Sequence, residues 1–312
     1  SSLHATAVMG NPLTRAVLFP APPRSYSDGD PSVIWDTDPE TKIKRPFLHI
    51  TTDWRGYPLG SDVTLVYLHA NAVDVGMVRE ELRDLAWATD VEILAIEYPG
   101  YGIFPGPTTT TGVDAAVDHG IRFLRRRGVP PRAIFLMGRS IGTGPACLAA
   151  ANMAAQEQPC GGLILQSPYL SVRAVVSDFV AGASLVVVDH WDSHQVVTQP
   201  AMKGTPLLVI HGKADEIIPF YHGLRLYDDA KCIYKHKLFP EDSTHNSWDM
   251  EMEVRIPVRD FVGRYRPCQG EQRPHRRGLS TVDLRKHVKR RSVWWIRLKG
   301  FLSLCCCPRL RA

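Results

Sequence analysis

Gly138, Ser140 and Gly142 form a Gly-x-Ser-x-Gly motif directly after the apolar run 133–137, and the helix-forming run 141–155 follows. A buried strand that turns sharply into a helix through this motif is the nucleophile-elbow pattern. Such a turn is so tight that a Cβ at either glycine would meet neighbouring backbone, and it holds the serine in a strained conformation above the sheet edge. An ordinary Gly/Ser turn is the alternative, because the residues of the motif are common. The motif predicts a serine nucleophile if the chain also supplies a base, an acid and an oxyanion hole.

An aspartate and a histidine in suitable positions follow Ser140 along the chain. Asp215 and His245 each come just after a segment that we predict as a strand, residues 206–211 and 233–239. A serine hydroxyl needs an imidazole to take its proton and a carboxylate to hold that imidazole in the correct tautomer. Glu216 is an alternative acid, while Asp215 could instead cap a turn and His245 could lie at the surface. Because the order Ser, Asp, His is that of an α/β-hydrolase triad, we predict Ser140, Asp215 and His245 as catalytic residues.

Two backbone N–H groups are needed to bind the negatively charged oxygen of the reaction intermediate. One is expected from Ile141, which follows the nucleophile at a helix N-terminus, where the helix dipole favours negative charge. The other is expected from the loop after the apolar run 63–69, where we predict Asn71, with Ala72 as the alternative. His69 could be a second base or could orient this loop. The predicted oxyanion hole therefore consists of Asn71 and Ile141.

Short runs rich in Val, Ile and Leu alternate with helical patterns along the chain. The predicted strands are residues 63–69, 91–97, 133–137, 162–166, 206–211 and 233–239. The helical segments include 113–127, for which Thr111 and Asp114 are the expected start, and 141–155. This alternation predicts a mostly parallel sheet covered by helices on both faces, the α/β-hydrolase fold. The carboxyl ends of such strands meet at one edge, and all the predicted site residues follow strand ends.

The length of 312 residues and a hydrophobic content of 44% allow one large domain with extensions. We predict an N-terminal extension at residues 1–17, a hydrolase domain at 18–264 and a tail at 265–312. The stretch 167–206 is too short for a large lid domain. We therefore expect a minimal lid or none, and a site open enough to admit an acyl group carried by a protein.

Composition excludes several classes of protein. The chain has no run of about 18 apolar residues and no secretory signal pattern, so we expect no transmembrane helix and a cytoplasmic location. Of seven cysteines, three are adjacent near the C-terminus and the others lack metal-ligand spacing. This pattern indicates reduced thiols rather than a disulfide scaffold or a zinc site. We expect no metal and no cofactor.

Charge is distributed unevenly between the body and the tail. From Arg264 onward the chain has 14 Lys and Arg against Glu271 and Asp283, a net charge of +12, while the remainder carries −7. Basic residues between 285 and 299 surround Trp and other apolar residues, which suits an anionic membrane surface. A solvated tail and a nucleic-acid-binding segment are the alternatives. Because a mildly acidic body is unlike a nucleic-acid binder, we expect no nucleic acid and a peripheral position on the cytoplasmic face of membranes.

Two segments are candidates for lipidation. Met9-Gly10-Asn11-Pro12-Leu13-Thr14 fits the myristoylation pattern, with Gly10 as the acceptor if Met9 is the initiator. The adjacent Cys305, Cys306 and Cys307 follow the basic, Trp-containing stretch and are candidate palmitoylation sites. A chance match is the alternative for Gly10. One myristoyl chain alone holds a protein weakly, so stable attachment needs a second signal.

Several segments at the predicted strand ends together resemble one known family. They are Leu68 to Gly76, Tyr98 to Gly102, Gly138 to Thr143, Gln166 to Pro168, His211 to Glu216 and Thr244 to Asn246, with the Pro-rich lead-in Leu18 to Tyr26. Over about residues 18 to 264 the chain is similar to the protein depalmitoylases of the α/β-hydrolase domain-containing protein 17 family. The resemblance implies hydrolysis of S-acyl thioesters on membrane-attached proteins, with Ser140, Asp215 and His245 at the triad positions of the family.

The chain departs from this family at a few positions. Ala70 and Thr244 replace glycines, Arg139 replaces a glutamine, and the cysteine cluster lies at the C-terminus rather than at the N-terminus. Ala70 could narrow the oxyanion loop, and Arg139 puts a positive charge next to the nucleophile, so both bear on substrate choice. The first hypothesis is a palmitoyl-protein thioesterase that works through an acyl-serine intermediate. The alternatives are a carboxylesterase or lipase acting on small esters or lipids, and a catalytically silent scaffold.

Overall fold

The computed structural model describes residues 19–52, 59, 61–179 and 190–267. Gly10, Cys305, Cys306 and Cys307 lie outside these residues, as do the extension 1–17 and nearly all of the tail 265–312. The described residues up to Pro267 form one compact unit. Within the described ranges, no helix combines the length and the apolar character needed to cross a bilayer.

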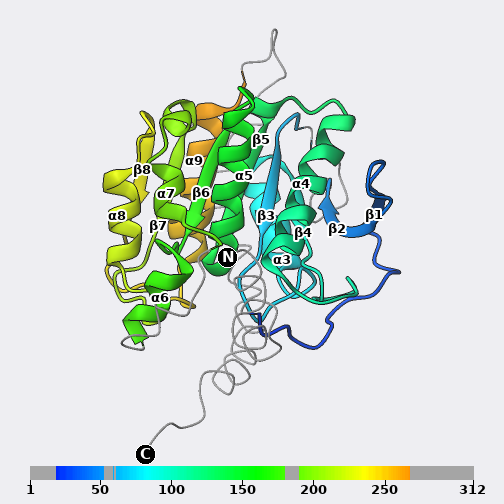
Figure 1. Cartoon of the computed structure of the whole chain (residues 1–312), viewed down its shortest axis with the longest axis horizontal. Coiled ribbons are helices and arrows are strands. Elements are labelled where there is room, and N and C mark those ends of the chain that lie inside the picture. Colours follow the sequence, from blue (N-terminus) through cyan, green and yellow to red (C-terminus); the bar gives the residue numbers. More distant parts are fainter. Residues whose placement is uncertain (1–18, 53–58, 60, 180–189, 268–312) are drawn as a thin grey trace, which may run out of the picture. The chain divides into compact units, whose positions relative to one another are not determined.

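An eight-stranded sheet is the centre of the molecule, with β1 at one edge and β8 at the other (Figure 1). Its order is β1-β2-β4-β3-β5-β6-β7-β8. The strands are β1 Val33–Thr37, β2 Lys44–Ile50, β3 Thr64–Leu68, β4 Glu92–Ile96, β5 Ile134–Arg139, β6 Gly162–Gln166, β7 Leu207–Ile210 and β8 Lys235–Leu238. The six neighbouring strands β4, β3, β5, β6, β7 and β8 are parallel to one another. Strand β2 is antiparallel to both of its neighbours, β1 and β4. The predicted sheet is confirmed, and β1 and β2 extend it beyond the six predicted strands.

Helices cover both faces of this sheet, because successive side chains of a strand point to opposite sides. On β3, Val66 and Leu68 belong to one buried cluster, and Leu65 and Tyr67 belong to the other. The first cluster is covered by α4 Thr110–Arg126, α5 Thr143–Ala155, α7 Ser193–Val197 and α8 Tyr221–Asp229. The second is covered by α3 Arg79–Thr89 and α9 Ile256–Tyr265. The two-sided core confirms the predicted α/β-hydrolase architecture.

The start of α4 differs from the prediction. Thr109 is the N-cap, and its hydroxyl accepts a hydrogen bond from the N–H of Gly112 at 3.0 Å. Thr111 and Asp114 lie inside the helix. The expectation was wrong because 108–111 is a run of four threonines, each with a side chain able to cap, and only the backbone path decides which one does.

The segment between β6 and β7 is short in its described part. It contains α6 Val172–Phe179, α7 and the 3₁₀ helix η4 Pro200–Gly204. Three further short helices complete the described elements: η1 Pro131–Ala133, η2 Ser140–Gly142 and the π-helix η5 Met250–Arg255. Of these, η2 contains the serine of the Gly-x-Ser-x-Gly motif, and η5 follows the predicted catalytic histidine.

Candidate active site

The turn from β5 into α5 has the strained geometry of a nucleophile elbow. Ser140 has a φ of +53°, in the left-handed region that non-glycine residues rarely occupy. A Cβ at Gly138 would overlap the backbone of Gly142, and a Cβ at Gly142 would overlap the carbonyl of Leu68. The predicted tightness of the turn and the strain at the serine are both confirmed.

Ser140, His245 and Asp215 form a continuous chain of hydrogen bonds. Oγ of Ser140 lies 3.0 Å from Nε2 of His245, and Nδ1 of His245 lies 2.9 and 3.0 Å from the two carboxylate oxygens of Asp215. All three residues are buried, at 7 to 9% exposure. When Nδ1 carries the ring proton and donates a hydrogen bond to Asp215, Nε2 has a free lone pair that can accept the hydrogen bond of the serine hydroxyl. The fold therefore brings together three predicted residues that are up to 105 positions apart in the sequence.

Asp215 is held by more partners than the triad alone requires. Its Oδ1 accepts hydrogen bonds from the N–H groups of Ile217 at 3.0 Å and Ile218 at 2.8 Å. Nε2 of His211 lies 3.4 Å from Oδ2 and 2.9 Å from the carbonyl oxygen of Ile218. Burial alone would raise the pKa of Asp215, but hydrogen bonds from His211 and His245 hold it well below its ordinary value. The carboxylate therefore stays charged.

His211 was not among the predicted site residues. It is fully buried at the end of the run 206–211, four positions before Asp215. A histidine that ends a buried strand just before the expected acid is the pattern that could have identified it. The other nearby acid, Glu216, binds the backbone of the histidine: its carboxylate accepts the N–H of His245 at 3.2 Å.

The two predicted oxyanion-hole residues follow the ends of two adjacent parallel strands, β3 and β5, at equivalent positions. Leu68 of β3 is the register partner of Gly138 of β5. Asn71 and Ile141 each follow three positions later. Because the backbone of Gly142 packs on the carbonyl groups of Leu68 and His69, the elbow and the Asn71 loop are in direct contact.

Arg139 lies on the α3 side of β5. Its neighbours two and four positions earlier, Met137 and Phe135, belong to the cluster beneath α3 and α9. Burial raises the pKa of Glu81 on α3, and the charge of Arg139 opposes this shift. The positive charge expected next to the nucleophile therefore also acts on an acidic residue of α3.

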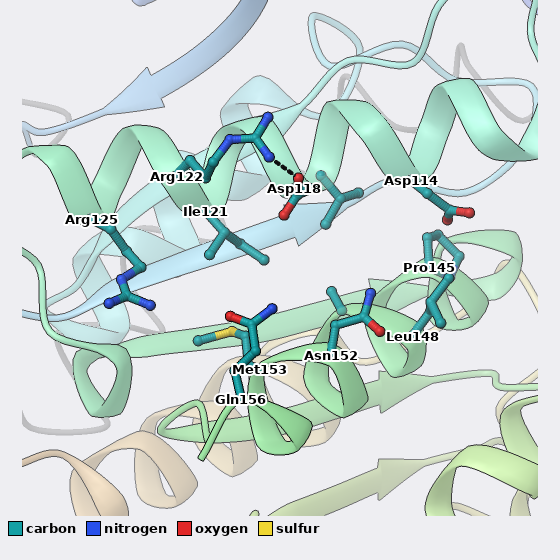
Figure 2. A pocket seen from close by; sticks show the side chains of 12 residues that line it. Asp114, Asp118, Ile121, Arg122, Arg125, Pro145, Leu148, Asn152, Met153 and Gln156 are labelled. Carbon is teal, nitrogen blue, oxygen red and sulfur yellow. Dashed lines mark hydrogen bonds and ion pairs between the residues drawn. The ribbon is translucent and has the colours of Figure 1, made fainter. Parts of the chain in front are cut away.

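Titratable groups elsewhere in the described part of the chain do not form a metal centre. Within these ranges no group of three or more His, Cys, Asp or Glu side chains could hold a metal ion. Cys147 and Cys160 are free thiols, and burial raises the pKa of each to about 12. A groove between α4 and α5, with the Asp118–Arg122 ion pair on its α4 side, contains none of the predicted site residues (Figure 2).

Comparison with known proteins finds relatives of the chain by sequence. It is 30% identical over 209 residues to alpha/beta hydrolase domain-containing protein 17C of Xenopus laevis, covering 67% of this chain and 64% of the relative. For human protein 17C the identity is 30% over 208 residues, covering 66% of this chain and 60% of the relative. Over about two-thirds of its length the chain is similar to alpha/beta hydrolase domain-containing protein 17. It spans less than two-thirds of the length of these relatives, and no family model matches it.

Solved structures show the same fold at lower identity. An esterase from Pyrococcus furiosus has a TM-score of 0.58 and 18% identity, covering 78% of this chain and 99% of that chain. A serine hydrolase without a lid from Xanthomonas campestris has a TM-score of 0.52 and 17% identity, covering 76% of this chain and 96% of that chain. These likenesses establish the α/β-hydrolase fold of the chain.

The lowered pKa of Asp215 predicts a pH-dependent contribution to stability. A carboxylate with a depressed folded-state pKa stabilises the fold above its unfolded value of about 3.9, and this stabilisation is lost as the pH falls below that value. Asp215→Asn should therefore be less stable than wild type at pH 7, by a margin that shrinks below about pH 4. Urea unfolding of both proteins at pH 7, 5, 4 and 3 measures this margin.

The exposed Asp242 provides the control for this measurement. Asp242→Asn should stay within about 0.5 kcal/mol of wild type at each pH, as expected for a surface substitution. A margin for Asp215→Asn that is the same at pH 7 and pH 3 would contradict the assignment of a depressed pKa.

Proposed function

We propose that the protein is a serine hydrolase with Ser140 as nucleophile, His245 as general base and acid, and Asp215 as the group that orients His245. The observation that carries this proposal is the hydrogen-bonded chain from Ser140 through His245 to Asp215. Similarity to alpha/beta hydrolase domain-containing proteins and to an esterase fold supports it.

The reaction proceeds in two balanced steps. Oγ of Ser140 attacks the acyl carbonyl while Nε2 of His245 takes the serine proton and delivers it to the leaving group, which departs as a thiol or an alcohol. Water then attacks the acyl-serine and gives a proton to His245. The ester bond to Oγ breaks, His245 returns the proton to Oγ, and the carboxylic acid is released with Ser140 restored. In both steps the N–H groups of Asn71 and Ile141 donate hydrogen bonds to the carbonyl oxygen of the acyl group, on which negative charge develops.

The substrate that we propose is an S-acylated protein cysteine. This choice is supported by the resemblance of the strand-end motifs to protein depalmitoylases. Partly buried apolar side chains also lie next to the triad in the sequence: Ile141 follows the nucleophile, and Ile217 follows Asp215 by two positions. Val175 and Val176 of α6 pack against the same cluster. These side chains offer apolar surface to an acyl chain.

We predict that Ser140 is the residue labelled by a fluorophosphonate probe. Wild type should be labelled, while Ser140→Ala should lose the label and also lose about 10³-fold or more of its activity on a p-nitrophenyl ester, because the nucleophile is absent. Gel fluorescence and an absorbance assay measure the two effects. Ser61→Ala, a substitution just before β3 at the opposite end of that strand from the site, is the control and should label as wild type does. An unlabelled wild type would favour a silent scaffold, and equal labelling of Ser140→Ala would exclude Ser140 as nucleophile.

We further predict a preference for thioesters over oxygen esters. An S-palmitoyl peptide and its O-palmitoyl serine analogue, otherwise identical, differ only in the leaving group, and a thiol leaves more readily than an alcohol because its pKa is lower. The value of kcat/KM for the thioester should be higher by about 10-fold or more, equivalent to at least ~1.4 kcal/mol. Hydrolysis of both peptides by purified enzyme, followed by mass spectrometry, provides the comparison. Faster hydrolysis of the ester would end the depalmitoylase assignment and favour the carboxylesterase or lipase.

We also propose that the basic tail holds the protein at an anionic membrane surface. Each Lys or Arg near such a surface contributes about 1 kcal/mol. The full chain, made without lipid modification, should therefore bind phosphatidylserine-containing vesicles, and a chain that ends at Pro267 should bind them at least 10-fold more weakly. Vesicle sedimentation measures the bound fraction, with neutral phosphatidylcholine vesicles as control. Equal partitioning of the two chains would exclude the tail as the membrane-binding segment.

A further inference from the structure

Three segments that are far apart in the sequence meet at one buried carboxylate. Glu97 follows β4 and is fully buried. Its Oε1 lies 3.1 Å from Nε2 of His69 and accepts the N–H of Tyr98 at 3.2 Å. Its Oε2 accepts the hydroxyl of Tyr26 at 2.7 Å and the N–H of Val75 at 3.2 Å. A carboxylate is suited to this position because it accepts on both oxygens, whereas an amide would place its NH₂ against donors.

His69 links Glu97 to the predicted oxyanion donor, the N–H of Asn71. Nδ1 of His69 lies 2.8 Å from the carbonyl oxygen of Ala70. Because a carbonyl only accepts, Nδ1 carries a proton, and the contact of Nε2 with Glu97 requires a second proton between those two atoms. The Ala70 carbonyl shares a planar trans peptide with the N–H of Asn71, and no cis peptide occurs in the described residues. Fixing the carbonyl therefore fixes the direction of the Asn71 N–H.

Two tyrosines immobilise the same loop from the β4 side. The Tyr98 ring stacks on the His69 ring with centroids 3.8 Å apart, and its hydroxyl donates to the His69 carbonyl at 2.9 Å. The hydroxyl of Tyr101 donates to the Asn71 side-chain oxygen at 3.2 Å. The backbone and the side chain of Asn71 are thus positioned by separate contacts.

The segment before β1 completes this arrangement through Tyr26. The N–H of Ser25 donates to Asp74 in the loop at 2.8 Å. A Cβ at Gly76 or at Gly102 would overlap the Tyr26 side chain, so both glycines make room for it. Burial and the nearby Glu97 charge raise the pKa of Tyr26 far above its ordinary value, which keeps the phenol protonated as a donor.

We propose that Glu97, His69 and Tyr26, which we call the Glu97 brace, are positioning residues that hold the Asn71 N–H in place for transition-state stabilisation. This inference rests on the proposed serine hydrolase activity, but it is independent of whether the substrate is a thioester or an oxygen ester. The Asn71 N–H that the brace positions binds the oxyanion, which exists only in the transition state and the tetrahedral intermediate. Weakening the brace therefore lowers kcat and leaves KM unchanged.

Tyr26→Phe tests the brace by removing a single hydroxyl group. With a p-nitrophenyl ester, kcat per active site should fall about 10-fold, less than the ~10²–10³-fold typical of losing an oxyanion donor outright, while KM stays within about 2-fold. End-point fluorophosphonate labelling counts the active sites, so that loss of folded protein does not enter kcat. The matched control is Tyr265→Phe, which removes a hydroxyl that lies 2.7 Å from Nε2 of His236 on β8. Its kcat per labelled site should equal that of wild type.

Glu97→Gln provides a second, stronger perturbation with little change in shape. Its amide places donors against donors, so kcat should fall further than in Tyr26→Phe, again at constant KM. A wild-type kcat per labelled site in both Tyr26→Phe and Glu97→Gln, or a loss expressed only in KM, would overturn the brace and leave the hydrolase proposal intact. A wild type that neither labels nor turns over the ester would overturn both.

Discussion

The close contact between the β5 elbow and the end of β3 is the constraint on which the rest of the site depends. The two strands are parallel neighbours with Leu68 opposite Gly138, and the backbone of Gly142 packs on the carbonyl of Leu68. No side chain fits between these backbones. The packing holds Ser140 at a positive φ and brings the loop after β3 against the start of the helix that carries Ile141. The same backbone contact therefore positions the proposed nucleophile and the proposed oxyanion loop.

The remaining groups reach the nucleophile because the strands on either side of β5 end at the same edge. In the sheet order, β4 lies two strands from β5 on one side and β7 lies two strands away on the other. Glu97 follows β4, and Asp215 lies in the loop after β7. Both are carboxylates buried among donors, and each fixes one histidine, His69 or His245. One carboxylate orients the proposed base, and the other orients the proposed oxyanion loop.

Much of this arrangement was accessible from the sequence, because the features involved are local. Five of the six predicted strands contain a run of buried apolar residues, since a parallel strand covered on both faces needs such residues. The sixth, β8, contains Lys235, His236 and Lys237 and lies at the sheet edge. In contrast, β1 and β2 were missed. Strand β1 lies at the edge and is only half-buried, and β2 includes Lys44 and Arg45, so neither has such a run. The tight elbow was predictable because its glycines and serine are adjacent in the sequence.

The contacts that link distant segments were not predictable in the same way. Tyr26 and Glu97 are 71 positions apart, and nothing in the periodicity around either residue indicates the other. His211 was hidden because it looks like the last residue of an ordinary buried strand. The sequence did leave two roles open for His69, and its contacts with Glu97 and the Ala70 carbonyl favour the role of orienting the loop.

The use of buried carboxylates for both tasks has a physical reason. A buried charge is costly unless it is surrounded by donors, so Glu97 and Asp215 stabilise only the loop conformations that bring those donors to them. Any loop movement that separated His245 from Asp215, or Val75 and His69 from Glu97, would leave a charge uncompensated in the interior. The same cost that makes these residues unfavourable as isolated charges therefore keeps the proposed base and the proposed oxyanion loop in a single arrangement before substrate binds. Such preorganisation is what electrostatic stabilisation of a transition state requires, because the dipoles then need no reorientation during the reaction.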